Sequence, residues 1–137
     1  MFRLKRTKAD KLFSDYIRMR DKWTCVRCRR KHEPFKQTLD CSHYFSRSHP
    51  KASIRFDFEN SDALCKIPCH QGVNGWEHQK NRENKLKEIG NGEYTVFKIK
   101  QLGQERFDAL VIRAHTPNKI DEITLCIGLQ KLIDGIK

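Results

Sequence analysis

The sequence predicts a small α+β metalloprotein in which a bound metal ion compensates for a thin hydrophobic core. The chain has 137 residues, of which 37% are hydrophobic, and this length suits one modest domain over residues 1–137. Two cysteine pairs, Cys25/Cys28 and Cys65/Cys69, have the short spacing of zinc ligands. Strand-like stretches lie between the pairs, and helical periodicity lies on either side of them. Because such a metal site exists only in the folded chain, its binding energy stabilises the fold.

Residues 8–22 form the predicted N-terminal helix. Its apolar stripe consists of Ala9, Leu12, Phe13, Tyr16 and Ile17. Residues 23–80 form the predicted zinc-bound core. Within it, a strand over residues 39–45 and a returning strand over residues 54–58 flank a polar, proline-containing turn, and together they predict a hairpin. A helix is expected to begin near Cys69.

Residues 81–137 form the predicted C-terminal helical region. Gly103 separates two short helical pieces, and a Thr-Pro-Asn sequence at residues 116–118 ends the second of them. The last helix is expected to bury one apolar face, formed by Ile120, Ile123, Ile127, Leu129 and Ile133.

The charge distribution indicates a nucleic-acid partner. The net charge is +11, and the excess lies in and before the cysteine-rich region, since residues 104–137 carry no net charge. A localised basic face is typical of nucleic-acid binding, although a merely soluble basic protein is the simpler alternative. Arg47, Lys51 and Arg55 are the predicted phosphate contacts, and for them the alternative is salt bridging to Asp57 or Glu59.

The sequence predicts a cytoplasmic protein with no membrane partner. No apolar run approaches the roughly 20 residues of a membrane-spanning helix, and the charged N-terminus lacks the apolar core of a signal peptide. Six cysteines in a reducing compartment favour metal binding over disulfides. Cys25, Cys28, Cys65 and Cys69 therefore predict a structural zinc site with four thiolate ligands.

The cysteines and histidine nearest to this set have simpler interpretations. Cys41 and Cys126 are expected to be small buried thiols, although Cys41 could substitute as a ligand. His32 is expected to be a surface histidine.

The stretch around the second cysteine pair also carries residues for phosphodiester hydrolysis. That reaction needs an activated water and an ion that neutralises charge on the phosphate and the leaving oxygen. His43 is the predicted general base, and Asp40 and His70 are the predicted ligands of a catalytic ion. Asn60 is expected to pin the hairpin or orient His43. Magnesium suits a site with few protein ligands, and a histidine ligand also admits manganese or nickel.

Taken together, His43, Asn60 and His70, interleaved with the cysteine pairs, resemble the HNH or ββα-metal nucleases. The stretches KADKLFSDYIRMRD, CSHYFSR, RFDFEN, LCKIPCH and GQERFDAL further resemble the NinG (Rap) recombination proteins of lambdoid phages in order and spacing. The resemblance covers roughly residues 8–112. It implies a zinc-stapled ββα-metal core with additional N- and C-terminal helices, His43 as general base, Asn60 as the middle residue of the triad and His70 as a ligand of the catalytic ion.

Two features depart from the HNH pattern. Ser42 stands where many of these nucleases have an acidic or histidine ligand, and Asp40, on the same face of the predicted strand, is the expected substitute. Three residues separate Cys65 from Cys69, which shifts His70 by one place and leaves Asn74 as a reserve ligand.

The expected function is that of a divalent-metal-dependent DNA endonuclease. The resemblance alone implies branched recombination intermediates such as Holliday junctions or D-loops, phage recombination proteins as partners, and the host cytoplasm as location. A homodimer would suit a two-fold junction. Two alternatives remain, an HNH nicking or restriction enzyme with sequence preference and a non-catalytic zinc DNA-binding module.

Overall fold

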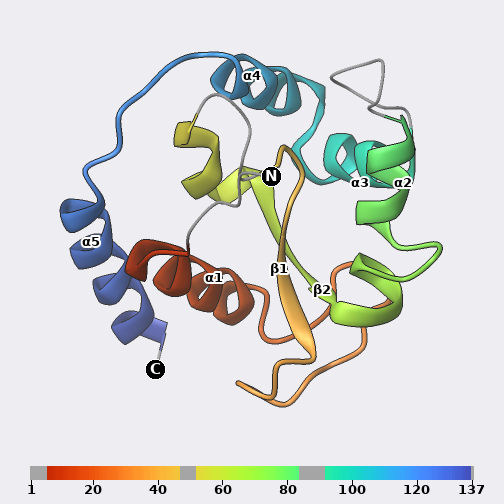
Figure 1. Cartoon of the computed structure of the whole chain (residues 1–137), viewed down its shortest axis with the longest axis horizontal. Coiled ribbons are helices and arrows are strands. Elements are labelled where there is room, and N and C mark those ends of the chain that lie inside the picture. The colour runs from red at the N-terminus through yellow and green to blue at the C-terminus, as the bar shows by residue number, and fades with distance from the viewer. Residues whose placement is uncertain (1–5, 47–51, 84–91, 137) are drawn as a thin grey trace.

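The computed structural model describes residues 6–46, 52–83 and 92–136 (Figure 1). Its longer elements are α1 (Lys8–Arg20), β1 (Leu39–His43), β2 (Ser61–Cys65), α2 (Trp76–Glu83), α3 (Glu93–Leu102), α4 (Gln104–Ala114) and α5 (Glu122–Ile136). Three short helical turns are η1 (Ala52–Phe56), η2 (Phe58–Asn60) and η3 (Lys66–His70). The two strands cross the middle of the molecule, with α1 and α5 on one side and α2 and α3 on the other (Figure 1). The predicted α+β class is confirmed.

The sheet consists of β1 and β2, which pair antiparallel with Leu39 opposite Cys65 and His43 opposite Ser61. The predicted returning strand at residues 54–58 is therefore wrong, because that segment forms η1 and the start of η2. Its alternating apolar residues imitate strand periodicity, but Phe56 and Phe58 instead pack around the ring of Phe13. The true partner strand is buried on both faces, so it lacks the alternation that marks a half-exposed strand.

The predicted N-terminal helix is confirmed as α1. A capping box between Thr7 and Asp10 satisfies its first backbone amides. The predicted apolar stripe buries Phe13 and Ile17, which pack with Leu129 of α5 in the smaller of two core clusters. The larger cluster joins β1 and β2 to α3 and α4.

The turn between η3 and α2 explains why the helix expected near Cys69 begins only at Trp76. At Gly75 a side chain would place its Cβ 2.5 Å from the carbonyl oxygen of His70. The backbone therefore folds back on η3 at a distance that only glycine permits.

The C-terminal region is helical, as predicted. Gly103, with a φ of 82°, separates α3 from α4, and α5 follows the Thr-Pro-Asn segment. The predicted buried face of α5 is only partly correct: Leu129 and Ile133 are buried, whereas Ile123 and Ile127 are 77% and 55% exposed. Within the described residues, no helix has the length and apolar character needed to cross a membrane.

A buried ion pair connects α3 to the sheet. Lys98 Nζ lies 2.9 Å from Asp62 Oδ2, and both side chains are almost fully buried. Tyr94 donates a hydrogen bond to the same carboxylate at 3.1 Å, and its hydroxyl lies 3.2 Å from Ser42 Oγ. Burial lowers the pKa of Lys98, although the charge of Asp62 acts in the opposite direction. This network fixes α3 beneath the strand that carries His43.

We expect Asp62→Ala to destabilise the protein by about 3–5 kcal/mol, because it leaves the Lys98 charge buried without its partner. Urea unfolding followed by circular dichroism measures the loss. Asp108→Ala, on the exposed face of α4, is the matched control and should change stability by no more than about 0.5 kcal/mol. Equal stability of the two variants would contradict a structural role for the ion pair.

Candidate metal centre and active site

Four cysteines form a cluster that could bind zinc, as the sequence predicts. The Sγ atoms of Cys25, Cys28, Cys65 and Cys69 all lie within 4.8 Å of one another, and those of Cys28 and Cys65 are 3.4 Å apart. A zinc ion bound by four thiolates at about 2.3 Å holds the sulfur atoms about 3.8 Å apart. The donor set and its dimensions therefore fit one tetrahedral ion.

The first cysteine pair lies in a tight turn that is attached to the sheet. The Cys25 amide donates to the Arg30 carbonyl, and the Arg29 amide donates to the Cys25 carbonyl, both at 2.9 Å. Arg29 has a φ of 67°, the left-handed conformation that closes the turn. The Val26 amide donates to Ala63 of β2 at 3.0 Å. These bonds bring the turn against the strand that ends at the second pair.

Burial and the neighbouring groups perturb the pKa values of Cys28, Cys65 and Cys69. Burial raises the pKa of Cys69 to about 12, and neighbouring thiols add to that increase. Cys28 is affected by burial in the same direction, but hydrogen bonds from the Arg30 backbone and from the other thiols outweigh burial and lower its pKa to about 7. A bound divalent cation would stabilise all four groups as thiolates.

His32 contacts the cluster, in contrast to the surface position predicted for it. Its Nε2 lies 3.0 Å from Cys65 Sγ, and its Nδ1 lies 2.8 Å from Thr38 Oγ1. The expected surface histidine is thus half-buried against a sulfur atom. An imidazole N–H in this position can donate to the thiolate and disperse its negative charge.

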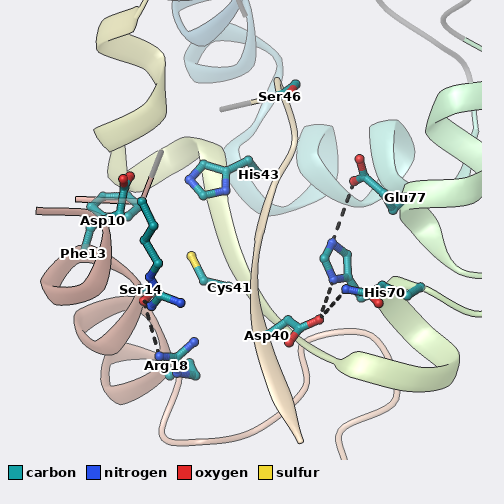
Figure 2. Close-up of a pocket in the computed structure, with 12 residues that line it drawn as sticks. Asp10, Phe13, Ser14, Arg18, Asp40, Cys41, His43, Ser46, His70 and Glu77 are labelled. Atoms are coloured by element: carbon teal, nitrogen blue, oxygen red, sulfur yellow. Dashed lines mark hydrogen bonds and ion pairs between the residues drawn. The ribbon is translucent and has the colours of Figure 1, made fainter. Parts of the chain in front are cut away.

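Beside the cluster, a cavity of about 530 Å³ opens between α1, β1 and the η3–α2 segment (Figure 2). Three of the predicted site residues line it: Asp40, His43 and His70. Figure 2 shows His43 on the α1 side of β1 and His70 on the α2 side. The predicted base and the predicted ligands thus line one cavity from opposite sides of β1.

Asp40 and His70 form a hydrogen-bonded pair. His70 Nδ1 lies 2.8 Å from Asp40 Oδ2, which also accepts from Gln71 Nε2 at 3.1 Å. The other carboxylate oxygen lies 3.0 Å from Lys66 Nζ. Burial raises the pKa of Asp40, but the bonds to His70 and Lys66 outweigh burial and hold the pKa below its usual value.

With both of its oxygens engaged and a lysine beside it, Asp40 is better placed to orient His70 than to contact an ion itself. This geometry differs from the predicted one, in which Asp40 is a direct ligand. A carboxylate that fixes the far nitrogen of a metal-binding histidine is a common arrangement.

Glu77, at the start of α2, is a candidate ligand that the sequence analysis missed. Its Oε2 lies 3.8 Å from His70 Nε2, and both residues line the cavity (Figure 2). Two ligands at about 2.1 Å from one ion lie about 3 Å apart when adjacent and about 4.2 Å apart when opposite, so one ion fits between them. The backbone carbonyl of Asn74, the reserve ligand, accepts a hydrogen bond from Arg27 at 2.9 Å.

Burial lowers the pKa of His70, but hydrogen bonding to Asp40 and Glu77 outweighs burial and raises it. Two flanking carboxylates favour a positive charge at this position, whether that charge is a proton or a metal ion.

The contacts of the His43 ring include a hydrogen bond to the backbone and a stacked aromatic ring. Its Nε2 lies 3.0 Å from the carbonyl oxygen of Arg55, and its ring stacks on Phe13 at 5.9 Å between centroids. A carbonyl only accepts hydrogen bonds, so the neutral imidazole carries its proton on Nε2 and its lone pair on Nδ1.

Asn60 ties together the two ends of the segment between the strands. Its Oδ1 accepts from the Phe45 amide at 2.7 Å, and its Nδ2 donates to the carbonyls of Phe45 and Ile54 at 3.0 and 3.1 Å. The side chain is fully buried. Asn60 thus pins the connection that follows β1, although the predicted hairpin of residues 39–45 and 54–58 is not formed.

The predicted DNA-contacting residues are only partly described. Arg47 and Lys51 lie outside the described residues. Arg55 forms an ion pair with Asp10, and its side chain is 11% exposed. The predicted alternative partners of Arg55, Asp57 and Glu59, bind Arg113 instead. Because its charge is neutralised and covered, Arg55 is a poor candidate for a phosphate contact.

We expect Cys65→Ala to lose zinc and cooperative folding, because structural zinc contributes about 10 kcal/mol or more, comparable to the whole stability of a small domain. Metal analysis of the purified protein should give one zinc per wild-type chain, and thermal melting should show the loss in the variant. Cys126→Ala, outside the cluster, should keep both the metal and the melting transition. A zinc-free wild-type protein with a normal melt would contradict the metal centre.

Comparison with family models, curated proteins and solved structures finds no match for this chain. The resemblance to the HNH nucleases and to the NinG proteins therefore stays a prediction from the sequence motifs.

Proposed function

We propose that the protein is a divalent-metal-dependent DNA endonuclease of the HNH type. The observation that carries this proposal is the shared cavity, in which His43 and the Asp40–His70 pair lie around one space. A histidine in a purely structural role would not need to line a polar cavity beside a second, carboxylate-oriented histidine. The net charge of +11 favours a polyanionic substrate.

His43 acts as the general base. Its bond to the Arg55 carbonyl keeps the Nε2 proton in place, and its lone pair on Nδ1 takes a proton from the attacking water. Stacking on Phe13 and the Asn60 bonds restrict how β1 and the following segment can move. The base therefore keeps its orientation while the substrate binds.

His70 and Glu77 would hold the catalytic ion, and Asp40 would orient His70. Bound there, magnesium or manganese would supply positive charge to the phosphate and to the leaving oxygen. The carboxylates hold His70 in place and provide the negative potential that attracts a cation. The raised pKa of His70 means that proton and metal compete for Nε2.

DNA with a branched structure is the proposed substrate class, and this part of the proposal rests on the resemblance to the NinG proteins. The same resemblance suggests phage recombination proteins as partners and the host cytoplasm as location. A homodimer acting on a two-fold junction is consistent with the exposed apolar side chains of α5.

We expect His43→Ala to lower the cleavage rate on a four-way junction by about 100-fold or more, because it removes the general base. Zinc content and DNA affinity should stay at the wild-type level. Cleavage of a labelled junction with and without magnesium, alongside a matched linear duplex, provides the measurement. His78→Ala, which changes an exposed histidine, is the control and should cut normally.

The same assay separates the alternatives. A non-catalytic zinc DNA-binding module would bind the junction but show no magnesium-dependent cleavage in the wild-type protein. An HNH enzyme with sequence preference would cut junction and duplex equally at chosen sequences.

We expect Glu77→Gln to raise the manganese concentration needed for half-maximal cleavage by about 10-fold or more, because it removes a charged ligand. Asp40→Asn should weaken metal binding by about 10- to 100-fold through the loss of His70 orientation. A manganese titration of cleavage measures both effects. Glu105→Gln, which changes an exposed glutamate of α4, should leave the titration unchanged. If Glu77→Gln needs the same manganese concentration as the wild type for half-maximal cleavage, Glu77 is not a ligand of the ion.

A further inference from the structure

A second cavity of about 470 Å³ adjoins the first, and Arg6, Arg18 and Asp40 line both. It lies between α1 and the segment that leads from α1 into β1. Two aromatic residues, Trp23 and Phe35, are among its lining residues. The aromatic pair therefore lines the cavity next to the proposed catalytic site.

The aromatic pair is presented to solvent by a strained backbone. Phe35 is 64% exposed, and its ring centroid lies 4.7 Å from that of Trp23 with an interplanar angle of 62°. The φ angles of Trp23 and Phe35 are 54° and 62°. Bulky residues rarely adopt this left-handed conformation, and strain of this kind concentrates at binding sites.

The cavity also carries an excess of positive charge. Its lining includes five cations, Arg6, Lys11, Arg18, Lys36 and Lys66, against three carboxylates. Lys11 pairs with Asp15 and Lys66 pairs with Asp40, but their side chains are 65% and 47% exposed, so both ammonium groups can reach solvent. The Arg18 guanidinium lies 5.9 Å from the centre of the Trp23 ring, which polarises the aromatic surface.

We propose that this second cavity binds a single-stranded stretch of the DNA substrate, with an unpaired base stacked on Phe35 against Trp23. The proposal rests on the proposed function. Cations that follow a phosphate backbone next to an exposed aromatic ring are the means by which proteins bind single strands. In a duplex the faces of the bases are covered by their neighbours, so the aromatic pair would select DNA with unpaired nucleotides beside the cleavage site.

Binding without added divalent ions tests this proposal independently of cleavage. The probes are a fluorescent single-stranded oligonucleotide and a fully paired duplex of the same sequence, followed by anisotropy. Phe35→Ala should weaken single-strand binding by about 5- to 100-fold, which is the effect of losing one base–aromatic stack, and should leave duplex binding unchanged. Phe35→Tyr should restore single-strand binding. Ile112→Ala, which removes an equally exposed apolar side chain on α4, should change neither affinity.

A 2-aminopurine base in the single strand gives a second readout, because stacking quenches its fluorescence. Quenching by the wild type and by Phe35→Tyr, but not by Phe35→Ala, would support the stacked base. If Phe35→Ala weakens both probes equally or neither, the base-stacking inference fails while the nuclease proposal stands on its cleavage assay. If the wild-type protein binds neither probe, the proposed function fails as well.

Discussion

The rest of the molecule depends on the convergence of four thiols from three segments. Cys25 and Cys28 lie in the turn after α1, Cys65 ends β2, and Cys69 lies in η3. Arg27, between the first two cysteines, extends this link, since its guanidinium donates to the carbonyls of Cys69 and Asn74. The same group pairs with Glu93 of α3 and lies 5.4 Å from the Trp76 ring centre.

The segment that carries His70 and Glu77 is thus held at several points by the turn of the first cysteine pair. A metal ion in the cluster would order the segment that carries His70 and Glu77 without touching it. This is a suitable solution for a basic chain with a small core, in which side-chain packing alone supplies little rigidity.

The strand β1 is held from both of its faces. On one face, Ser42 meets the network of Tyr94, Asp62 and Lys98, and on the other His43 packs on Phe13. Buried charges are costly unless they are paired, so the network enforces one position of α3 against the sheet. Basic side chains of α1 also form ion pairs within the chain. Arg18 binds Asp15, and Arg20 binds Asp21. Net charge therefore overstates the number of cations that lie outside ion pairs.

The sequence by itself determined the parts that depend on local patterns. Cysteine spacing predicted the four-thiol cluster, and helical periodicity predicted α1, α3, α4 and α5, because ligand spacing and amphipathic stripes are properties of neighbouring residues. The motif order also singled out Asp40, His43, Asn60 and His70, which the structure gathers around one cavity and its supporting turn.

Only the tertiary structure decided which distant groups meet. It paired β1 with Ser61–Cys65 and not with residues 54–58. It also formed the ion pair between Arg55 and Asp10 and placed His32 against Cys65. It also brought Glu77 to His70 and Phe35 to Trp23. These contacts depend on how the elements pack in space, and neither periodicity nor spacing along the chain encodes that packing.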